Sequence, residues 1–395
     1  MPSQIAVIGA SVAGVAVADE LRRLGHAGRI LLVGDERHLP YDRPPLSKGL
    51  LTGATDPDRV LLREREHYDR QGIALLLGTS AVHLDGRDIK LGDGRVLSPD
   101  VVVVATGARA RRLPGIPERS TVVTLRGLDD ALQLRRLLSP GASCVIVGGG
   151  FIGGETATAV RKLGLEATLV EAARLPLAHL VGDEVAAAFL RAHREAGVRV
   201  LCGTAVRDIE RADGGERVVL TDGRSVDGDL VIVGLGSTPN TEWLADSGLD
   251  VQDGVRCDAT GATDVPGVFA IGDVASWYDP ALDRHQRHEH WTRAHEQARI
   301  TAARILGLEP APSPVGDVPY FWSDQHGRRI QALGHPELAD EFQVVHGSLN
   351  EDSFVVLYGR TGRTVGAVGY NAAAHLMRHR TTVAASAPLH RETAG

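Results

Sequence analysis

The chain has 395 residues, enough for two or three domains with a large buried core. Its hydrophobic content of 43% and charged content of 24% are ordinary for a globular protein, and its net charge of −7 provides no overall basic field to hold nucleic acid or an anionic membrane. No apolar run reaches the roughly 18 residues of a membrane-spanning helix, so we expect a cytoplasmic enzyme with no nucleic-acid or membrane partner.

A glycine-rich turn follows the first apolar run. Residues 5–8 are Ile-Ala-Val-Ile, and residues 9–14 read Gly-Ala-Ser-Val-Ala-Gly before a helix-forming stretch. In such a strand, turn and helix, the glycines let the backbone approach a pyrophosphate that lies at the helix N-terminus. Ser11 stands where the middle glycine is usual, and its small hydroxyl side chain can donate to a phosphate. A second strand ends at Asp35, whose carboxylate suits ribose hydroxyls. The candidate nucleotide-binding residues here are Gly9, Ser11, Ala13, Gly14 and Asp35.

The same pattern occurs a second time. Residues 144–147 read Cys-Val-Ile-Val, residues 148–153 read Gly-Gly-Gly-Phe-Ile-Gly, and the strand at 167–170 ends at Glu171. A single G-x-G-x-x-G match is weak, because a chain with 46 glycines is expected to contain roughly 0.6 matches by chance. Two copies that each lead to an acidic residue predict two dinucleotide sites. The candidates in the second copy are Gly148, Gly150, Ile152, Gly153 and Glu171.

The cysteines and histidines do not form a ligand pattern. Cys144, Cys202 and Cys257 are far apart in sequence, so we expect buried structural thiols and neither a metal site nor a local redox disulfide. Four histidines cluster within residues 285–295 without acidic or thiol companions at ligand spacing. We expect these histidines to be solvated or to face a cofactor.

Two longer motifs lie outside the glycine turns. Residues 40–48 read Pro-Tyr-Asp-Arg-Pro-Pro-Leu-Ser-Lys, and residues 263–273 read Thr-Asp-Val-Pro-Gly-Val-Phe-Ala-Ile-Gly-Asp. Both runs resemble those of the FAD-dependent, NAD(P)H-using ferredoxin reductases of bacterial oxygenase systems, a branch of the pyridine nucleotide–disulfide oxidoreductase superfamily. Residues 103–107 and 234–240 are similar to further motifs of that family. The resemblance thus covers nearly the whole chain, although the cysteine pair of related disulfide reductases is absent.

The resemblance implies that the first unit binds FAD and the second binds NADH. By this resemblance Arg43 and Lys48 lie against the FAD, Asp273 binds the ribityl chain, and residues 287–291 line the isoalloxazine ring. Residues 319–324 match a run that approaches the ring from the C-terminal domain. The residues implied to bind FAD beyond the first turn are Arg43, Lys48, Ala105, Thr106, Gly107, Gly272, Asp273, Glu289, His290 and Trp291. Core packing is the alternative for Trp291 and Trp322.

These motifs predict an α/β fold with two Rossmann-like dinucleotide-binding domains and a C-terminal α+β domain. The FAD-binding domain is expected to be discontinuous, at 1–108 and 237–310, with an NAD(H)-binding domain at 109–236 and the C-terminal domain at 311–395. Apolar runs at 342–345, 354–358 and 364–368 predict antiparallel strands in the C-terminal domain. A terminal helix is expected near residues 372–379.

The implied activity is NADH:ferredoxin oxidoreduction, with FAD taking a hydride and passing single electrons to a small iron–sulfur protein that feeds a P450 or Rieske oxygenase. Lys48, Glu155 and Trp291 are the candidate catalytic residues. Glu155 is expected in the first turn of the helix after Gly153, facing its dipole and pairing with Lys48, as a family glutamate does. The alternative for Glu155 is a charge at the start of a helix, and the alternative for Lys48 is a surface lysine. The alternatives for the protein are an NADH oxidase, another flavin-dependent reductase or a non-catalytic redox reporter.

Charge patterns suggest the choice of donor and partner. Glu171 accepts from a ribose 2′-hydroxyl but repels a 2′-phosphate, so we expect NADH to be preferred, with Arg174 partly offsetting that repulsion. Seven arginines within residues 284–395 form a candidate surface for steering an acidic ferredoxin, namely Arg284, Arg287, Arg293, Arg328, Arg329, Arg378 and Arg380. Ordinary solvated charge interleaved with carboxylates is the alternative.

Overall fold

The structure is a computed structural model that describes residues 1–117, 119–311 and 318–389. Its contacts divide the chain into two compact units. The first consists of residues 1–42, 58–109 and 238–314, and the second of residues 43–57, 110–237 and 315–395. In the part of the chain described, no helix is both long and apolar enough to cross a membrane.

The first unit is built on a five-stranded parallel sheet in the order β19-β7-β1-β2-β3. Its strands are β1 (Gln4–Ile8), β2 (Arg29–Gly34), β3 (Ile73–Leu77), β7 (Val101–Val104) and β19 (Val268–Ala270). Most residues of β1, β2, β7 and β19 are buried and apolar, as in a parallel sheet covered on both faces, whereas only Ile73 is buried in the edge strand β3. The strand order reverses at β1, where β2 lies on one side and β7 on the other, and ligands of such sheets bind at the carboxyl ends of these strands.

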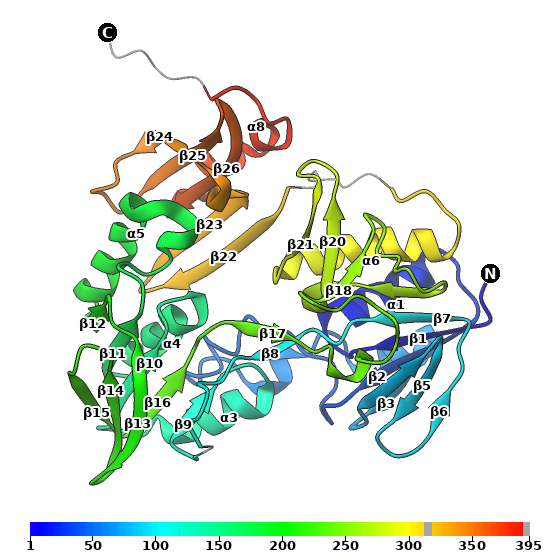
Figure 1. The fold of residues 1–395 in the computed structure, drawn as a ribbon, viewed down its shortest axis with the longest axis horizontal. Helices are drawn as coiled ribbons and strands as arrows, with labels where there is room; N and C mark the ends of the chain where they lie inside the picture. The colour runs from blue at the N-terminus through cyan, green and yellow to red at the C-terminus, as the bar shows by residue number, and fades with distance from the viewer. Residues whose placement is uncertain (118, 312–317, 390–395) are drawn as a thin grey trace. The chain divides into compact units, whose positions relative to one another are not determined.

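Helices and two small sheets complete the first unit. Figure 1 shows α1 and α6 packed together beside the parallel sheet. The helices are α1 (Val12–Arg23), α2 (Arg65–Gln71) and α6 (Trp291–Ile305), with 3-10 turns η2 (Glu242–Leu244) and η3 (Gly272–Val274), while η1 (Pro57–Val60) begins at the unit boundary. One small sheet contains β4 (Ala81–Asp85), β5 (Asp88–Leu91) and β6 (Val96–Leu97), and the other contains β18 (Val255–Cys257), β20 (Ala275–Asp279) and β21 (Arg284–Arg287).

The second unit contains a parallel sheet with the corresponding order, β12-β11-β10-β16-β9. Its strands are β9 (Val122–Thr124), β10 (Ser143–Val147), β11 (Glu166–Glu171), β12 (Arg199–Cys202) and β16 (Leu230–Val233). The helices are α3 (Leu128–Leu137), α4 (Phe151–Lys162) and α5 (Ala178–Glu195). An antiparallel sheet contains β13 (Val206–Ala212), β14 (Gly215–Leu220) and β15 (Ser225–Gly228), and the chain passes between the units at β8 (Ala108–Ala110) and β17 (Ser237–Pro239).

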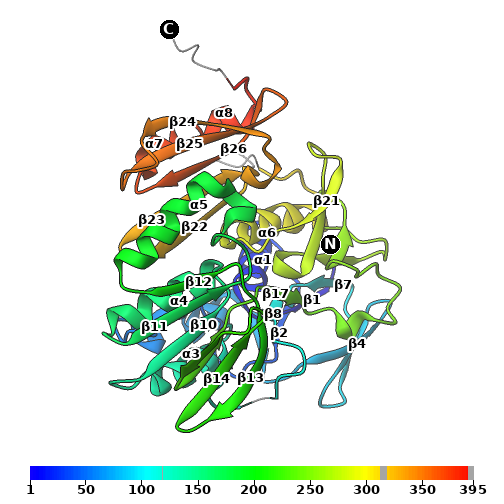
Figure 2. The ribbon, with the colours of Figure 1, turned by 60° about the vertical axis from the view of Figure 1, so that its left-hand side comes forward.

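A five-stranded antiparallel sheet at the C-terminus also belongs to the second unit, in the order β22-β23-β26-β25-β24. Its strands are β22 (Tyr320–Gln325), β23 (Arg328–Gly334), β24 (Glu341–Gly347), β25 (Phe354–Arg360) and β26 (Arg363–Tyr370), followed by α7 (Ala373–Met377) and α8 (Arg380–Ala384), with the 3-10 turn η4 (Pro336–Leu338) between β23 and β24. Figure 2 shows α5 lying along β22 and β23. Val185 and Phe189 of α5 share one apolar cluster with Phe354, Tyr358 and Tyr370 of the sheet.

The fold confirms the predicted class, with two Rossmann-like sheets and a sheet-rich C-terminal part. The three predicted C-terminal strands lie within β24, β25 and β26. The helix predicted near residues 372–379 is present as α7. A second short helix, α8, follows it, and Leu376 of α7 and Val383 of α8 reach the same apolar cluster. The contacts also group residues 43–57 with the second unit, although they lie within the predicted FAD-binding domain.

Candidate functional site

The first glycine turn is held to the end of β7 by backbone packing. Gly9 has φ +122°, and a Cβ there would lie 2.0 Å from the carbonyl oxygen of Ala105. A Cβ on Gly14 would lie 1.9 Å from the carbonyl oxygen of Gly9. Neither position can hold a side chain without moving the backbone. The turn therefore brings the predicted residue Ala105 directly against the start of α1.

The second glycine turn repeats this geometry at the end of β10. Gly148 has φ +102°, and a Cβ there would lie 2.3 Å from the carbonyl oxygen of Gly234. A Cβ on Gly153 would lie 1.9 Å from the carbonyl oxygen of Gly148. A Cβ on Gly150, by contrast, meets no atom within 4 Å in the described part of the chain. Protein packing does not require Gly150, and the open position at the N-terminus of α4 fits a pyrophosphate.

That open position explains why a serine can replace the middle glycine of the first turn. Ser11 precedes α1 as Gly150 precedes α4, and its side chain makes no capping hydrogen bond to the helix. The side chain therefore occupies space that the fold leaves open beside the helix N-terminus. The residues present fit the phosphate groups of a dinucleotide at both turns.

The acidic residues of the two units differ in position. Val33 pairs with Ile8 in the first sheet, and Val170 pairs with Val147 in the second, so Glu171 corresponds to Gly34 and not to Asp35. Packing explains the difference. A Cβ on Gly34 would lie 2.7 Å from the Cβ of Ala10. In the second unit the residue after the first glycine is Gly149, which leaves room for the side chain of Glu171.

Glu171 is oriented by two backbone amides. Its Oε2 accepts from Gly149 N–H at 2.6 Å, and its Oε1 accepts from Ala173 N–H at 2.7 Å. Arg174, which was predicted to offset part of the repulsion of a 2′-phosphate, pairs with Asp183. The carboxylate is thus fixed beside the glycine turn. Asp35 is exposed and accepts from Glu36 N–H at 3.0 Å.

Other predicted residues of the first unit converge on the first glycine turn. A Cβ on Gly272, which has φ +73°, would lie 2.9 Å from the Cβ of Ala13, so η3 and Asp273 lie at the start of α1. The Gly272 N–H donates to Gln297 Oε1 at 2.7 Å. Two motifs more than 250 residues apart thus meet at the strand-order reversal.

The segment after β7 is pinned by Asn240. Thr106 Oγ1 donates to the Asn240 carbonyl at 2.9 Å, and the Asn240 side chain donates back to the Thr106 carbonyl at 2.9 Å. The Asn240 N–H donates to the Gly107 carbonyl at 3.0 Å. These bonds fix the predicted residues Thr106 and Gly107 where the chain leaves the first parallel sheet.

Trp291 begins α6, and its indole Nε1–H donates to Asp42 Oδ1 at 2.7 Å. This bond ties the 289–291 segment, which includes the exposed Glu289 and half-buried His290, to the end of the 40–42 run. Asp42 was not among the predicted site residues. Its position within the motif at residues 40–48 was the available signal. Among the described residues there is no group of three or more His, Cys, Asp or Glu side chains arranged for a metal.

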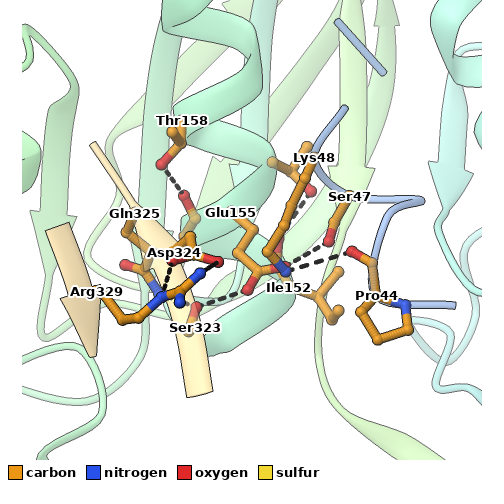
Figure 3. A network of polar contacts seen from close by, with 12 residues as sticks. Pro44, Ser47, Lys48, Ile152, Glu155, Thr158, Ser323, Asp324, Gln325 and Arg329 are labelled. Atoms are coloured by element: carbon orange, nitrogen blue, oxygen red, sulfur yellow. Dashed lines mark hydrogen bonds and ion pairs between the residues drawn. The ribbon is translucent and has the colours of Figure 1, made fainter. Parts of the chain in front are cut away.

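The second unit brings Lys48 and Glu155 together. Lys48 Nζ lies 2.7 Å from Glu155 Oε2, and the carboxylate side chain is 5% exposed. Figure 3 shows Lys48, Ser47 and Ser323 pointing toward this carboxylate. Ser47 Oγ donates to Oε2, and Ser323 Oγ donates to Oε1 at 2.7 Å. The predicted pairing is confirmed, whereas the two serines were missed.

One detail of the Glu155 prediction was wrong. Helix α4 begins at Phe151, so Glu155 is its fifth residue and the first turn holds no acidic side chain. The negative charge is met by Lys48 and two hydroxyls, and not by the helix N-terminus. In the same unit, Arg43 Nη1 donates to the Arg126 carbonyl at 2.6 Å. Cys144 and Cys257 are buried, while Cys202 is only half-buried, and all three thiols are free.

Comparison with known proteins identifies the class. Residues 3–298 match the pyridine nucleotide-disulphide oxidoreductase family, and residues 320–395 match the reductase C-terminal family. The chain belongs to the pyridine nucleotide-disulphide oxidoreductases, which use FAD and a pyridine nucleotide.

Similar proteins include ferredoxin reductase components of dioxygenase systems. It is 40% identical to the chlorobenzene dioxygenase ferredoxin reductase component of Cupriavidus sp. (strain PS12), over 94% of this chain and 90% of that protein. It is 36% identical to putidaredoxin reductase of Pseudomonas putida, over 90% and 85% of the two chains. The structure of a covalent putidaredoxin reductase–putidaredoxin complex matches with a TM-score of 0.93 and 34% identity, covering 98% of this chain and 94% of that chain.

Proposed function

We propose that this protein is an FAD-dependent NADH:ferredoxin oxidoreductase that supplies electrons to an oxygenase through a small iron–sulfur carrier. The observation that carries the proposal is the pair of glycine turns, each at the reversal of strand order in its own parallel sheet. The names of the relatives support ferredoxin as the electron acceptor. We further propose that the protein acts in the cytoplasm.

The first unit supplies the FAD-binding residues in this proposal. The backbone around Gly9 and Ser11 approaches the pyrophosphate, Asp35 faces the adenosine ribose, and Asp273 accepts from hydroxyls of the ribityl chain. Segments 105–107 and 289–291 lie against the flavin. Bound FAD accepts the electron pair of a hydride and releases electrons one at a time, which NADH alone does not do.

The second unit supplies the NADH-binding residues and a charged pair. The backbone around Gly148 and Gly150 approaches the NADH pyrophosphate, with Ile152 and Gly153 at the start of α4 completing that turn. Glu171 accepts from the adenosine ribose. Lys48 and Arg43 are proposed to face the FAD, with Glu155 fixing the ammonium of Lys48. The FAD-binding domain is then residues 1–108 and 237–310, the NAD(H)-binding domain 109–236 and the C-terminal domain 311–395.

Lys48 retains one donor for such a contact. Its ammonium carries three N–H groups, and in the described part of the chain it contacts Glu155 Oε2 and the Pro44 carbonyl, the latter at 3.3 Å. Its side chain is 25% exposed. The third N–H is therefore able to donate to a bound ligand. Trp291, with its ring held by Asp42, is proposed to exclude water from the flavin.

Steady-state turnover distinguishes the proposal from an NADH oxidase. NADH consumption is measured with oxygen alone and with a panel of small iron–sulfur proteins, using cytochrome c as the terminal acceptor. Rapid turnover with at least one iron–sulfur protein and slow turnover with oxygen supports the reductase. Equally rapid NADH consumption with oxygen alone, unaffected by any carrier, would support the oxidase and refute the proposal.

A further inference from the structure

The buried carboxylate of Glu155 is held from two directions within the second unit. Lys48 and Ser47, from the 43–57 segment, both contact Oε2. Ser323, from β22 of the C-terminal sheet, is the donor to Oε1 at 2.7 Å. A carboxylate whose two oxygens have separate donors has a fixed plane, since rotation would break bonds on both sides.

Gln325 fixes the direction of the Ser323 hydroxyl. Its Nε2–H donates to Ser323 Oγ at 3.1 Å, so the hydroxyl proton of Ser323 is directed to Glu155. A Cβ on Gly154 would lie 2.5 Å from Gln325 Oε1, so the Gln325 side chain packs directly on the backbone of α4. Ser323 and Gln325 are both buried. The edge strand β22 of the C-terminal sheet therefore packs against Gly154, the residue that precedes Glu155.

We propose that Ser323 is a positioning residue for the Lys48–Glu155 pair, through which the C-terminal sheet fixes the ammonium that faces the FAD. This inference rests on the proposed function, because it takes the flavin as the group that Lys48 faces. The hydroxyl of Ser323 hydrogen-bonds to Glu155 and Gln325. It acts by keeping Oε1 occupied, so that Oε2 alone faces Lys48.

Removal of the Ser323 hydroxyl is expected to move the ammonium of Lys48. In Ser323→Ala the buried Oε1 loses its donor, and an unsatisfied buried acceptor is unfavourable. The carboxylate then rotates to share both oxygens with Lys48 and Ser47, which draws the ammonium toward Glu155. A positive charge withdrawn from the flavin stabilises its reduced form less. A displacement of about 1 Å in a positioned group is also enough to slow a reaction on the order of a hundredfold.

The test measures two properties of the FAD-loaded protein. The first is the midpoint potential of bound FAD by equilibrium titration with a reference dye, and the second is the rate constant of flavin reduction by NADH in stopped-flow. Ser323→Ala is expected to lower the potential by about 30 mV, a tenfold change for a two-electron couple, and to slow reduction at least tenfold. Ser323→Thr retains the hydroxyl and is expected to restore both.

A double-mutant cycle separates positioning from a general effect on folding. In a Glu155→Ala background, Ser323→Ala is expected to change neither property further, because the group through which Ser323 acts is gone. Ser353→Ala removes a serine hydroxyl elsewhere in the C-terminal part, where it donates to the Asn371 carbonyl, and is expected to behave as wild type.

Each outcome bears on the proposal. An unchanged potential and rate in Ser323→Ala overturns it, and so does an equal effect of Ser323→Ala with and without Glu155. If Ser323→Thr lowers the potential and slows flavin reduction as much as Ser323→Ala does, the proposal is also overturned, because packing and not the hydroxyl is then responsible. If wild-type protein binds no FAD, or its FAD is not reduced by NADH, the proposed function itself fails, which is a distinct result.

Discussion

Acidification is expected to loosen the attachment of the C-terminal sheet to α5 through two buried histidines. His326 Nε2 lies 2.8 Å from His193 Nδ1, with their rings edge to face. Burial, then the proximity of His326, lowers the pKa of His193 to about 3, although a hydrogen bond with Gln325 opposes the shift. Burial, then the charges of Arg328 and Arg161, lowers the pKa of His326 to about 4. Both rings are therefore neutral at pH 7.

The sign of the effect follows from where the proton binds. An exposed histidine, with a pKa near 6.5, is mostly protonated at pH 5, whereas the folded His193 is not, so acid favours the opened state. The stabilisation is complete above pH 6.5 and is lost as the pH falls toward 3. Between pH 7 and pH 5 the titration of His193 alone corresponds to about 2 kcal/mol of opening free energy.

Hydrogen exchange of the amides in α5, β22 and β23 measures this free energy, once corrected for intrinsic exchange at each pH. Between pH 7 and pH 5, the opening free energy of the wild type is expected to fall by about 2 kcal/mol more than that of His193→Gln. His179→Gln, which removes an exposed histidine from the same helix, is the matched control and is expected to follow wild type. Equal losses in wild type and His193→Gln would refute the reasoning.

Three further expectations concern cofactors and partner. Heat should release FAD and not FMN, as chromatography would reveal, and Asp273→Ala should lower flavin content while the second unit stays folded by circular dichroism. Glu171→Ala should lower the ratio of kcat/KM for NADH to that for NADPH by roughly thirtyfold, if repulsion of the 2′-phosphate is worth ~2 kcal/mol. Arg174 pairs with Asp183, so Arg174→Ala should leave this ratio near the wild-type value. A ratio near one in the wild type would contradict the assignment of Glu171. About 0.3 M salt should slow turnover at limiting ferredoxin more than turnover with a small neutral acceptor, and equal slowing would exclude steering.

The sequence predicted the parts of the site that depend on local chemistry. The glycine turns could be predicted because a strand, a glycine-rich turn and a helix follow one another directly in sequence. Backbone carbonyl oxygens lie too close to four of these glycines for any other residue, namely Gly9, Gly14, Gly148 and Gly153. Strands of the parallel sheets were readable from their runs of Val, Ile and Leu. The Lys48–Glu155 contact was predicted only through the family resemblance, since the two residues are 107 positions apart in sequence.

Contacts between distant segments were not readable. Ser323 and Asp42 lie in motifs that the sequence already singled out, but these motifs do not indicate that Ser323 donates to Glu155 or that Asp42 accepts from Trp291. Glu171 and Gly34 occupy corresponding positions in the two sheets, and this correspondence depends on strand pairing, which one sequence does not specify.

The arginine surface shows the same limit of sequence reasoning. Arg287 contacts Asp253 and Glu289, and Arg328 contacts Glu195 and Asp352. Both therefore fit interleaved charge better than a free positive patch. Arg293 and Arg329 also have carboxylate partners, Glu296 and Asp324. Steering by this surface stays a prediction, and the salt dependence of turnover tests it.

The most direct test of the central claim is a sequential anaerobic stopped-flow measurement on the FAD-loaded protein. The protein is first mixed with NADH and then with an excess of oxidised ferredoxin, while the visible flavin band is followed. We expect NADH to bleach the band and ferredoxin to restore it at a rate no slower than steady-state turnover. A flavin band that NADH does not bleach, or that ferredoxin does not restore while oxygen does, would contradict the assignment of this chain as a ferredoxin reductase.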